Sequence, residues 1–191
     1  FHNKIAQDGI VERELALHEF PAAEILWQWW AKYRGFSDQQ NALVTQDYYS
    51  DGGNKTPRYY QLLAINKTIE AIACGQNRIL LVMATGTGKT FTAFQIIWRL
   101  WKSKTKKRIL FLADRNILVD QTMTNDFKPF GPAMTKIQKR QANKSYEIYL
   151  ALYQGLTNYD EDKDAYREFS RDFFDLIVID GPALTSFPEM R

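Results

Sequence analysis

The fold class is decided by residues 79–90, which run Ile79-Leu80-Leu81-Val82-Met83-Ala84-Thr85-Gly86-Thr87-Gly88-Lys89-Thr90. The apolar run over residues 79–83 is typical of a short buried strand, and the apolar spacing over 90–101 predicts a helix directly after the loop. Such a loop turns successive backbone N–H groups inward, and the helix N-terminus adds partial positive charge, so the pair is suited to phosphate. We call residues 84–90 the phosphate loop; a plain glycine-rich turn is the alternative interpretation.

The residue types in the phosphate loop predict a nucleotide together with its metal ion. Lys89 is expected to reach the β- and γ-phosphates, and the Thr90 hydroxyl is expected to complete the shell of a Mg²⁺ ion. Asp180 ends the apolar run 176–179, where a carboxylate at the end of a strand beside the loop can hold Mg²⁺ through its waters. The remaining cofactor-binding residues expected in the loop are Thr85, Gly86, Thr87 and Gly88.

Gln61 is the candidate residue for recognising the base. It follows Tyr59 and Tyr60, ahead of the phosphate loop. A side-chain amide donates and accepts hydrogen bonds together, which matches the edge of adenine, and either tyrosine could stack on the ring. ATP and Mg²⁺ are therefore the expected cofactors, while a surface glutamine with no role in binding remains the alternative.

From residue 57 onward, helical and extended patterns alternate along the chain. Helices are expected over 62–72, 90–101, 116–127 and 164–172, and strands over 79–83, 109–112, 147–152 and 176–179. Largely apolar strands that alternate with amphipathic helices predict a parallel sheet with helices on both faces. The fold class is α/β.

Composition bounds the remaining possibilities. The chain has 191 residues, of which 45% are hydrophobic and 25% charged, so a disordered or collagen-like chain is excluded. Its longest apolar run, 79–84, is far shorter than the ~20 residues that a membrane span needs. A single cysteine, Cys74, fits a reducing compartment, and we expect a cytoplasmic protein without a membrane partner. A net charge of +3 permits a polyanionic partner without demanding one.

Residues 1–57 differ in character from the rest. Pro21 is suited to opening a helix that runs to about Tyr33, and the stretch Asp51-Gly52-Gly53-Asn54 is a turn or linker signal. We expect residues 1–57 to be a connector or docking segment and residues 58–191 to be the nucleotide-binding lobe.

Four stretches together resemble the first motor lobe of superfamily 2 helicases and translocases: Arg58–Gln61, Ala84–Thr90, Leu112–Gln121 and Leu176–Asp180. Within that group, residues 81–90 and 111–121 closely resemble the R (restriction, translocating) subunit of type I restriction enzymes. The resemblance implies a RecA-like lobe from a subunit that pumps double-stranded DNA with ATP and cuts it with a separate nuclease domain. It also implies partner subunits for specificity and methylation.

The same resemblance implies which residues contact DNA. Arg115 and Gln121 lie where the family's second motif contacts the nucleic-acid backbone, and Gln154 lies in another segment near the DNA strand. An arginine just after a strand can present a forked donor to phosphate, although a capping or ion-pairing arginine is the alternative.

The chain departs from the family directly after Asp180. The family has a glutamate there that activates the attacking water, whereas this chain has Gly181. We therefore expect the lobe to be incomplete at its C-terminus and the chain alone to be inactive. A non-hydrolysing nucleotide-binding module and, more weakly, a small-molecule kinase are the alternative functions.

Overall fold

Four parallel strands form the sheet of the computed structural model, in the spatial order β2-β3-β1-β4. The structure describes residues 10, 12, 14–53, 56–113, 122, 125–137, 143–152 and 169–181. The elements in chain order are η1 (Leu17–Glu19), α1 (Ala23–Arg34), α2 (Asp38–Thr45), α3 (Tyr59–Ala73), α4 (Lys89–Lys102), β1 (Ile109–Ala113), η2 (Lys128–Ala133), β2 (Met134–Lys136), β3 (Ile148–Leu152) and β4 (Leu176–Asp180). The predicted α/β class with a parallel sheet is confirmed.

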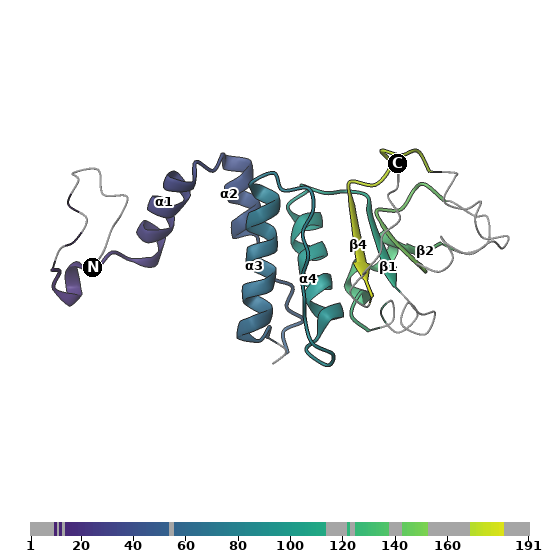
Figure 1. The fold of residues 1–191 in the computed structure, drawn as a ribbon, viewed down its shortest axis with the longest axis horizontal. Helices are drawn as coiled ribbons and strands as arrows, with labels where there is room; N and C mark the ends of the chain where they lie inside the picture. Colours follow the sequence, from purple (N-terminus) through teal and green to yellow (C-terminus); the bar gives the residue numbers. More distant parts are fainter. Residues whose placement is uncertain are drawn as a thin grey trace.

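The helices are arranged as successive layers beside the sheet. Figure 1 shows α4 between α3 and the sheet, with α2 against α3 and α1 standing away from this layer. The sequence of α4 explains its central place, because it is apolar on two sides. Phe94 and Ile97 pack toward the sheet, while Ile96 and Leu100 pack toward α3.

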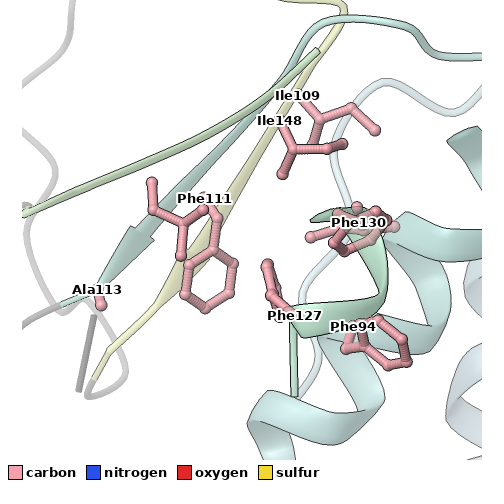
Figure 2. Close-up of a cluster of buried hydrophobic side chains, with 9 residues drawn as sticks. Phe94, Ile109, Phe111, Ala113, Phe127, Phe130 and Ile148 are labelled. Atoms are coloured by element: carbon pink, nitrogen blue, oxygen red, sulfur yellow. The ribbon is translucent and has the colours of Figure 1, made fainter. Parts of the chain in front are cut away.

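An aromatic cluster fills the space between α4 and the sheet. Phe94, Phe127 and Phe130 are buried together, and they meet β1 and β3 through Phe111 and Ile148 (Figure 2). On the opposite face, Tyr149 is fully buried against Phe169, Phe173 and Phe174. Most of the helix expected over 164–172 lies outside the described residues, and its described end, 169–172, is not helical. The helix expected over 116–127 also lies mostly outside them.

The strand expected over residues 79–83 is wrong: the segment has no regular secondary structure and pairs with no strand in the described part of the chain. Leu80 and Val82 are 80% and 81% exposed, while Ile79 and Leu81 are 38% and 39% exposed. The alternation is that of a strand with one side against the protein. Within the described residues β4 is the end of the sheet and pairs with β1 alone, so the run has no backbone partner there. An apolar run predicts a strand, but pairing requires a neighbour.

The sequence prediction lacked one strand, β2, one α-helix, α2, and the two short 3-10 helices η1 and η2. β2 is a three-residue strand that was not among the expected strands. α2 begins with a reciprocal cap, in which the Ser37 hydroxyl accepts from Gln40 N–H and the Gln40 side chain accepts from Ser37 N–H. A serine followed three residues later by glutamine is a known helix-start signal, so α2 was predictable. No helix in the described part of the chain is long and apolar enough to cross a membrane.

Candidate functional site: a phosphate loop beside the end of a parallel sheet

The phosphate loop turns through two glycines into the first residue of α4. Gly86 has φ +79°, and Gly88 caps α4 with φ +81° and ψ +43°. These are left-handed conformations that glycine adopts without a steric penalty. At Gly88 a Cβ atom would lie 2.5 Å from the amide nitrogen of Gln61, so that side chain would have to shift. The positive φ is therefore the reason that the loop needs glycine at position 88, and a side chain there would also displace the Gln61 amide.

Three donors of the loop converge on one carbonyl. The Ala84 carbonyl accepts from the Thr87 hydroxyl at 2.6 Å, from Thr87 N–H at 3.3 Å and from the Lys89 ammonium at 3.5 Å. The lysine contact is the longest of the three and lies at the limit of a hydrogen bond. Because Thr87 also satisfies this carbonyl, Lys89 can exchange the contact for a phosphate oxygen at little cost.

Thr90 and Asp180 meet although 90 positions separate them. The Thr90 hydroxyl donates to the Asp180 carboxylate at 3.0 Å, and both side chains are half-buried. The packing of α4 against β4 brings the two together, and Asp180 lies opposite Ala113 at the carboxyl ends of β4 and β1. The strand order reverses at β1, which has β3 on one side and β4 on the other. Ligands of open α/β sheets bind outside the strand ends at such a reversal.

The oxygen atoms of Thr90 and Asp180 fit a magnesium ion. Mg²⁺ prefers oxygen ligands and keeps several waters, so one hydroxyl and one carboxylate next to phosphate are a suitable protein contribution. With Lys89 in the neighbouring position, the described site offers an ammonium group that suits a phosphate and oxygen atoms that suit a metal ion. The sequence prediction named all three side chains, and the fold brings them to one place.

Gln61 is 7% exposed and contacts the loop directly. Its amide nitrogen donates to the Thr87 carbonyl at 2.8 Å, and its amide oxygen accepts from Arg58 N–H at 2.9 Å. One amide hydrogen and one oxygen lone pair remain for a base. Nearby, Tyr59 is 82% exposed and packs edge-on against Tyr60. The link from Gln61 to the loop was not expected, since no sequence pattern predicts which carbonyl an amide will meet.

The expected DNA contacts and the position after Asp180 remain to be placed. Arg115, Gln121 and Gln154 lie outside the described residues. Gly181 is described, and a Cβ atom built on it would meet nothing within 4 Å. A side chain at this position would therefore extend into open space beside Asp180.

Comparison with known proteins agrees with this geometry. A family model described as "Type III restriction enzyme, res subunit" matches residues 54–182. The chain is 61% identical over 181 residues to the type I restriction enzyme EcoAI endonuclease subunit of Escherichia coli, covering 94% of this chain and 22% of that protein. It is 37% identical over 131 residues to the EcoKI endonuclease subunit of Escherichia coli K12, covering 64% of this chain and 11% of that protein. The chain thus spans less than a quarter of the curated relatives it matches. It belongs to the family of restriction-enzyme res subunits, and the predicted resemblance to a type I R subunit is confirmed.

Proposed function

We propose that this chain is the ATP-binding part of a motor that translocates double-stranded DNA in a type I restriction enzyme. The observation that carries the proposal is the hydrogen bond from Thr90 to Asp180, which joins the start of α4 to the end of β4. Such a junction is suited to hold a metal ion against the phosphates of a nucleotide. In this proposal residues 58–191 form the motor lobe and residues 1–57 the connecting segment.

The residues of the site would divide the work of binding. Backbone N–H groups of the phosphate loop and the positive end of α4 would hold the phosphate oxygens. Lys89 would contact the β- and γ-phosphates, while Thr90 and Asp180 would hold Mg²⁺ directly or through water. The metal ion would neutralise charge on the phosphates, which is a general requirement of phosphoryl transfer.

DNA and partner subunits enter the proposal through the relatives, whose names describe endonuclease subunits of type I restriction enzymes. We propose that Arg115, Gln121 and Gln154 contact the phosphate backbone of double-stranded DNA, and that subunits for specificity and methylation complete the complex. Backbone contacts position a protein on DNA but carry no sequence information, so sequence choice would belong to the partner subunit.

Asp180→Asn tests the metal site. We expect ATP affinity in the presence of Mg²⁺ to fall roughly 10-fold or more, because a hydrogen bond to a charged group contributes ~1.5–3 kcal/mol. With the metal chelated, wild type and variant are expected to bind ATP equally, which calorimetry can measure. Asp175→Asn is the matched control. That exposed carboxylate immediately precedes β4 and accepts from the Lys107 and Arg108 N–H groups. An equal loss with and without Mg²⁺ would contradict the assignment.

Gln61→Ala tests base recognition separately from loop support. Losing the bond to the Thr87 carbonyl is expected to weaken ATP and GTP alike, whereas losing the contacts to adenine weakens ATP alone. The ratio of ATP to GTP affinity is therefore the informative quantity. We expect it to fall roughly 10-fold, the equivalent of about 1.4 kcal/mol, which one or two neutral hydrogen bonds supply. An unchanged ratio in paired calorimetric titrations would mean that Gln61 only supports the loop.

A further inference from the structure

Residues 37–50, which comprise α2 and the extended segment after it, lie across α3 and α4; we call them the strap. Gln95 on α4 holds the strap backbone with both ends of its amide. Its nitrogen donates to the Tyr49 carbonyl at 3.0 Å and its oxygen accepts from Tyr49 N–H at 2.9 Å. Gln95 is fully buried, so an unpaired amide there would be costly. This pairing fixes the strap to α4 at one point along the helix.

Arg99, one turn further along α4, fixes the strap at a second point. Its guanidinium donates to the Val44 carbonyl at 2.6 Å and to the Asn66 side chain at 2.8 Å, and it lies 4.8 Å from the ring centre of Tyr48. The Tyr48 hydroxyl bonds to the same Asn66 oxygen. Arg99 is 2% exposed, and its Nε atom has no hydrogen-bond partner. Burial lowers the pKa of the Arg99 guanidinium, while the nearby Tyr48 and Asp47 act to raise it. Burying a guanidinium costs free energy unless it is hydrogen-bonded, so Arg99 depends on its contacts with the strap and α3. These contacts require α4 to be correctly placed.

The strap also contacts α1. The Trp27 indole N–H donates to Asn41 on α2 at 3.0 Å, and Gln40 donates to the Ala73 carbonyl of α3 at 2.6 Å. At the end of α1, Arg34 forms an ion pair with Glu70 of α3 at 2.7 Å. α1 is therefore attached to α2 and α3, while α2 and α3 are linked to α4 by the Arg99 contacts. Figure 1 shows α1 at the far side of this layer from the sheet.

We propose that the strap couples the nucleotide site to α1 through α4. The proposal rests on the proposed function, because it requires a nucleotide at Lys89 and Thr90, the first two residues of α4. Gln95 lies six residues further along the same helix, about 9 Å at 1.5 Å per residue. A phosphate that restrains the start of α4 also restrains Gln95 and Arg99. It thereby reduces the entropic cost of docking the strap, so nucleotide binding favours the docked strap and steadies α1.

Coupling of this kind is reciprocal, and the reciprocity makes it measurable. If a nucleotide stabilises the docked strap by some factor, releasing the strap must weaken nucleotide binding by the same factor. Hydrogen exchange at Tyr49 N–H and at the amides of α2 reports docking, and calorimetry reports affinity. We expect Mg-ATP to raise strap protection about fivefold or more, the lower end of typical couplings between sites.

Gln95→Leu removes both strap bonds while keeping the side chain's size. We expect this variant to lose the nucleotide-dependent protection and to bind Mg-ATP about fivefold more weakly, by the reciprocity argument. Lys102→Leu is the matched control on α4, since Lys102 lies over the rings of Trp98 and Trp101 and not on the strap. Full nucleotide-dependent protection in Gln95→Leu would overturn the proposal.

Asn66→Asp tests the coupling by strengthening the attachment of the strap, and it removes no hydrogen bond from the core. Asn66 uses its side-chain oxygen for both Arg99 and Tyr48, so aspartate preserves the acceptor and adds a charge for the guanidinium. We expect higher strap protection without nucleotide and tighter Mg-ATP binding by a similar factor. Higher protection with unchanged affinity would overturn the coupling. Wild type that binds Mg-ATP with no change in the strap would overturn the coupling alone, whereas wild type that fails to bind it would overturn the proposed function as well.

Discussion

Lys89→Ala is expected to lower ATP affinity roughly 10- to 100-fold, because a charge-assisted contact to phosphate contributes ~1.5–3 kcal/mol and each ~1.4 kcal/mol is a factor of ten. Calorimetry with Mg-ATP measures the loss. The ammonium lies at the first residue of α4, where the helix end and the loop N–H groups favour the same anion. These groups remain in the variant, so binding should be weakened rather than abolished.

The structure also predicts that this loss comes without a loss of stability. The Ala84 carbonyl keeps its two bonds from Thr87 when the lysine is removed. The urea midpoint of Lys89→Ala is therefore expected to match that of wild type. Lys102→Ala, at the other end of α4, is the control for removing a lysine from this helix. Unchanged ATP affinity in Lys89→Ala, with Lys102→Ala also unchanged, would remove the assignment of the phosphate loop.

Much of the fold was predictable because its signals are local. The strands at 109–113, 148–152 and 176–180 are short apolar runs, and each formed within about one residue of its expected bounds. α4 followed from its apolar spacing, and α3 ends before Gly75, whose φ of +84° is the left-handed helix stop that a glycine permits. The run at 79–83 carries the same signal as these strands. The prediction of a strand there was wrong because a strand also needs a hydrogen-bonded neighbour, and the sequence of the run does not encode that neighbour.

The candidate site shows the same contrast between features with local sequence signals and features that depend on packing. The places of Lys89, Thr90 and Asp180 were predictable because each lies at the end of a recognisable element, whereas their roles in binding stay predictions. The Gln61 bond to Thr87 and the hold of Gln95 and Arg99 on the strap depend on how α3, α4 and the strap lie against one another. In sequence, Gln95 and Arg99 are simply polar residues within an amphipathic helix. Their near-complete burial is the observation that singles them out.

Residues 1–191 are expected to bind Mg-ATP but to release phosphate no faster than background, with or without DNA. Transfer of a phosphoryl group to water requires the phosphates to be positioned, the metal held, the water oriented and the developing charge compensated. Lys89, Thr90 and Asp180 are suited to the first two tasks. Gly181, at the position where the resemblance implies a water-activating glutamate, has no side chain for the third. A steady-state phosphate-release assay measures the rate.

The decisive change is Gly181→Glu, which the backbone should tolerate because a Cβ atom there meets nothing within 4 Å. In residues 1–191 we expect little rescue, since the charge that develops on the transferring phosphoryl group must also be compensated. An arginine that does this contributes ~10³–10⁵-fold in GTPases. In a chimera that continues into the following part of the EcoAI subunit, the same substitution is expected to raise DNA-dependent turnover by ~10²–10⁴-fold, the usual contribution of a general base. Lys89→Ala in that chimera is the control and should abolish the gain. Turnover near ~1 per second, the low end of ordinary enzymes, from the unmodified chain and lost in Lys89→Ala would contradict this role for position 181. Equal turnover of the glycine and glutamate chimeras would contradict it too, because another group would then be orienting the water.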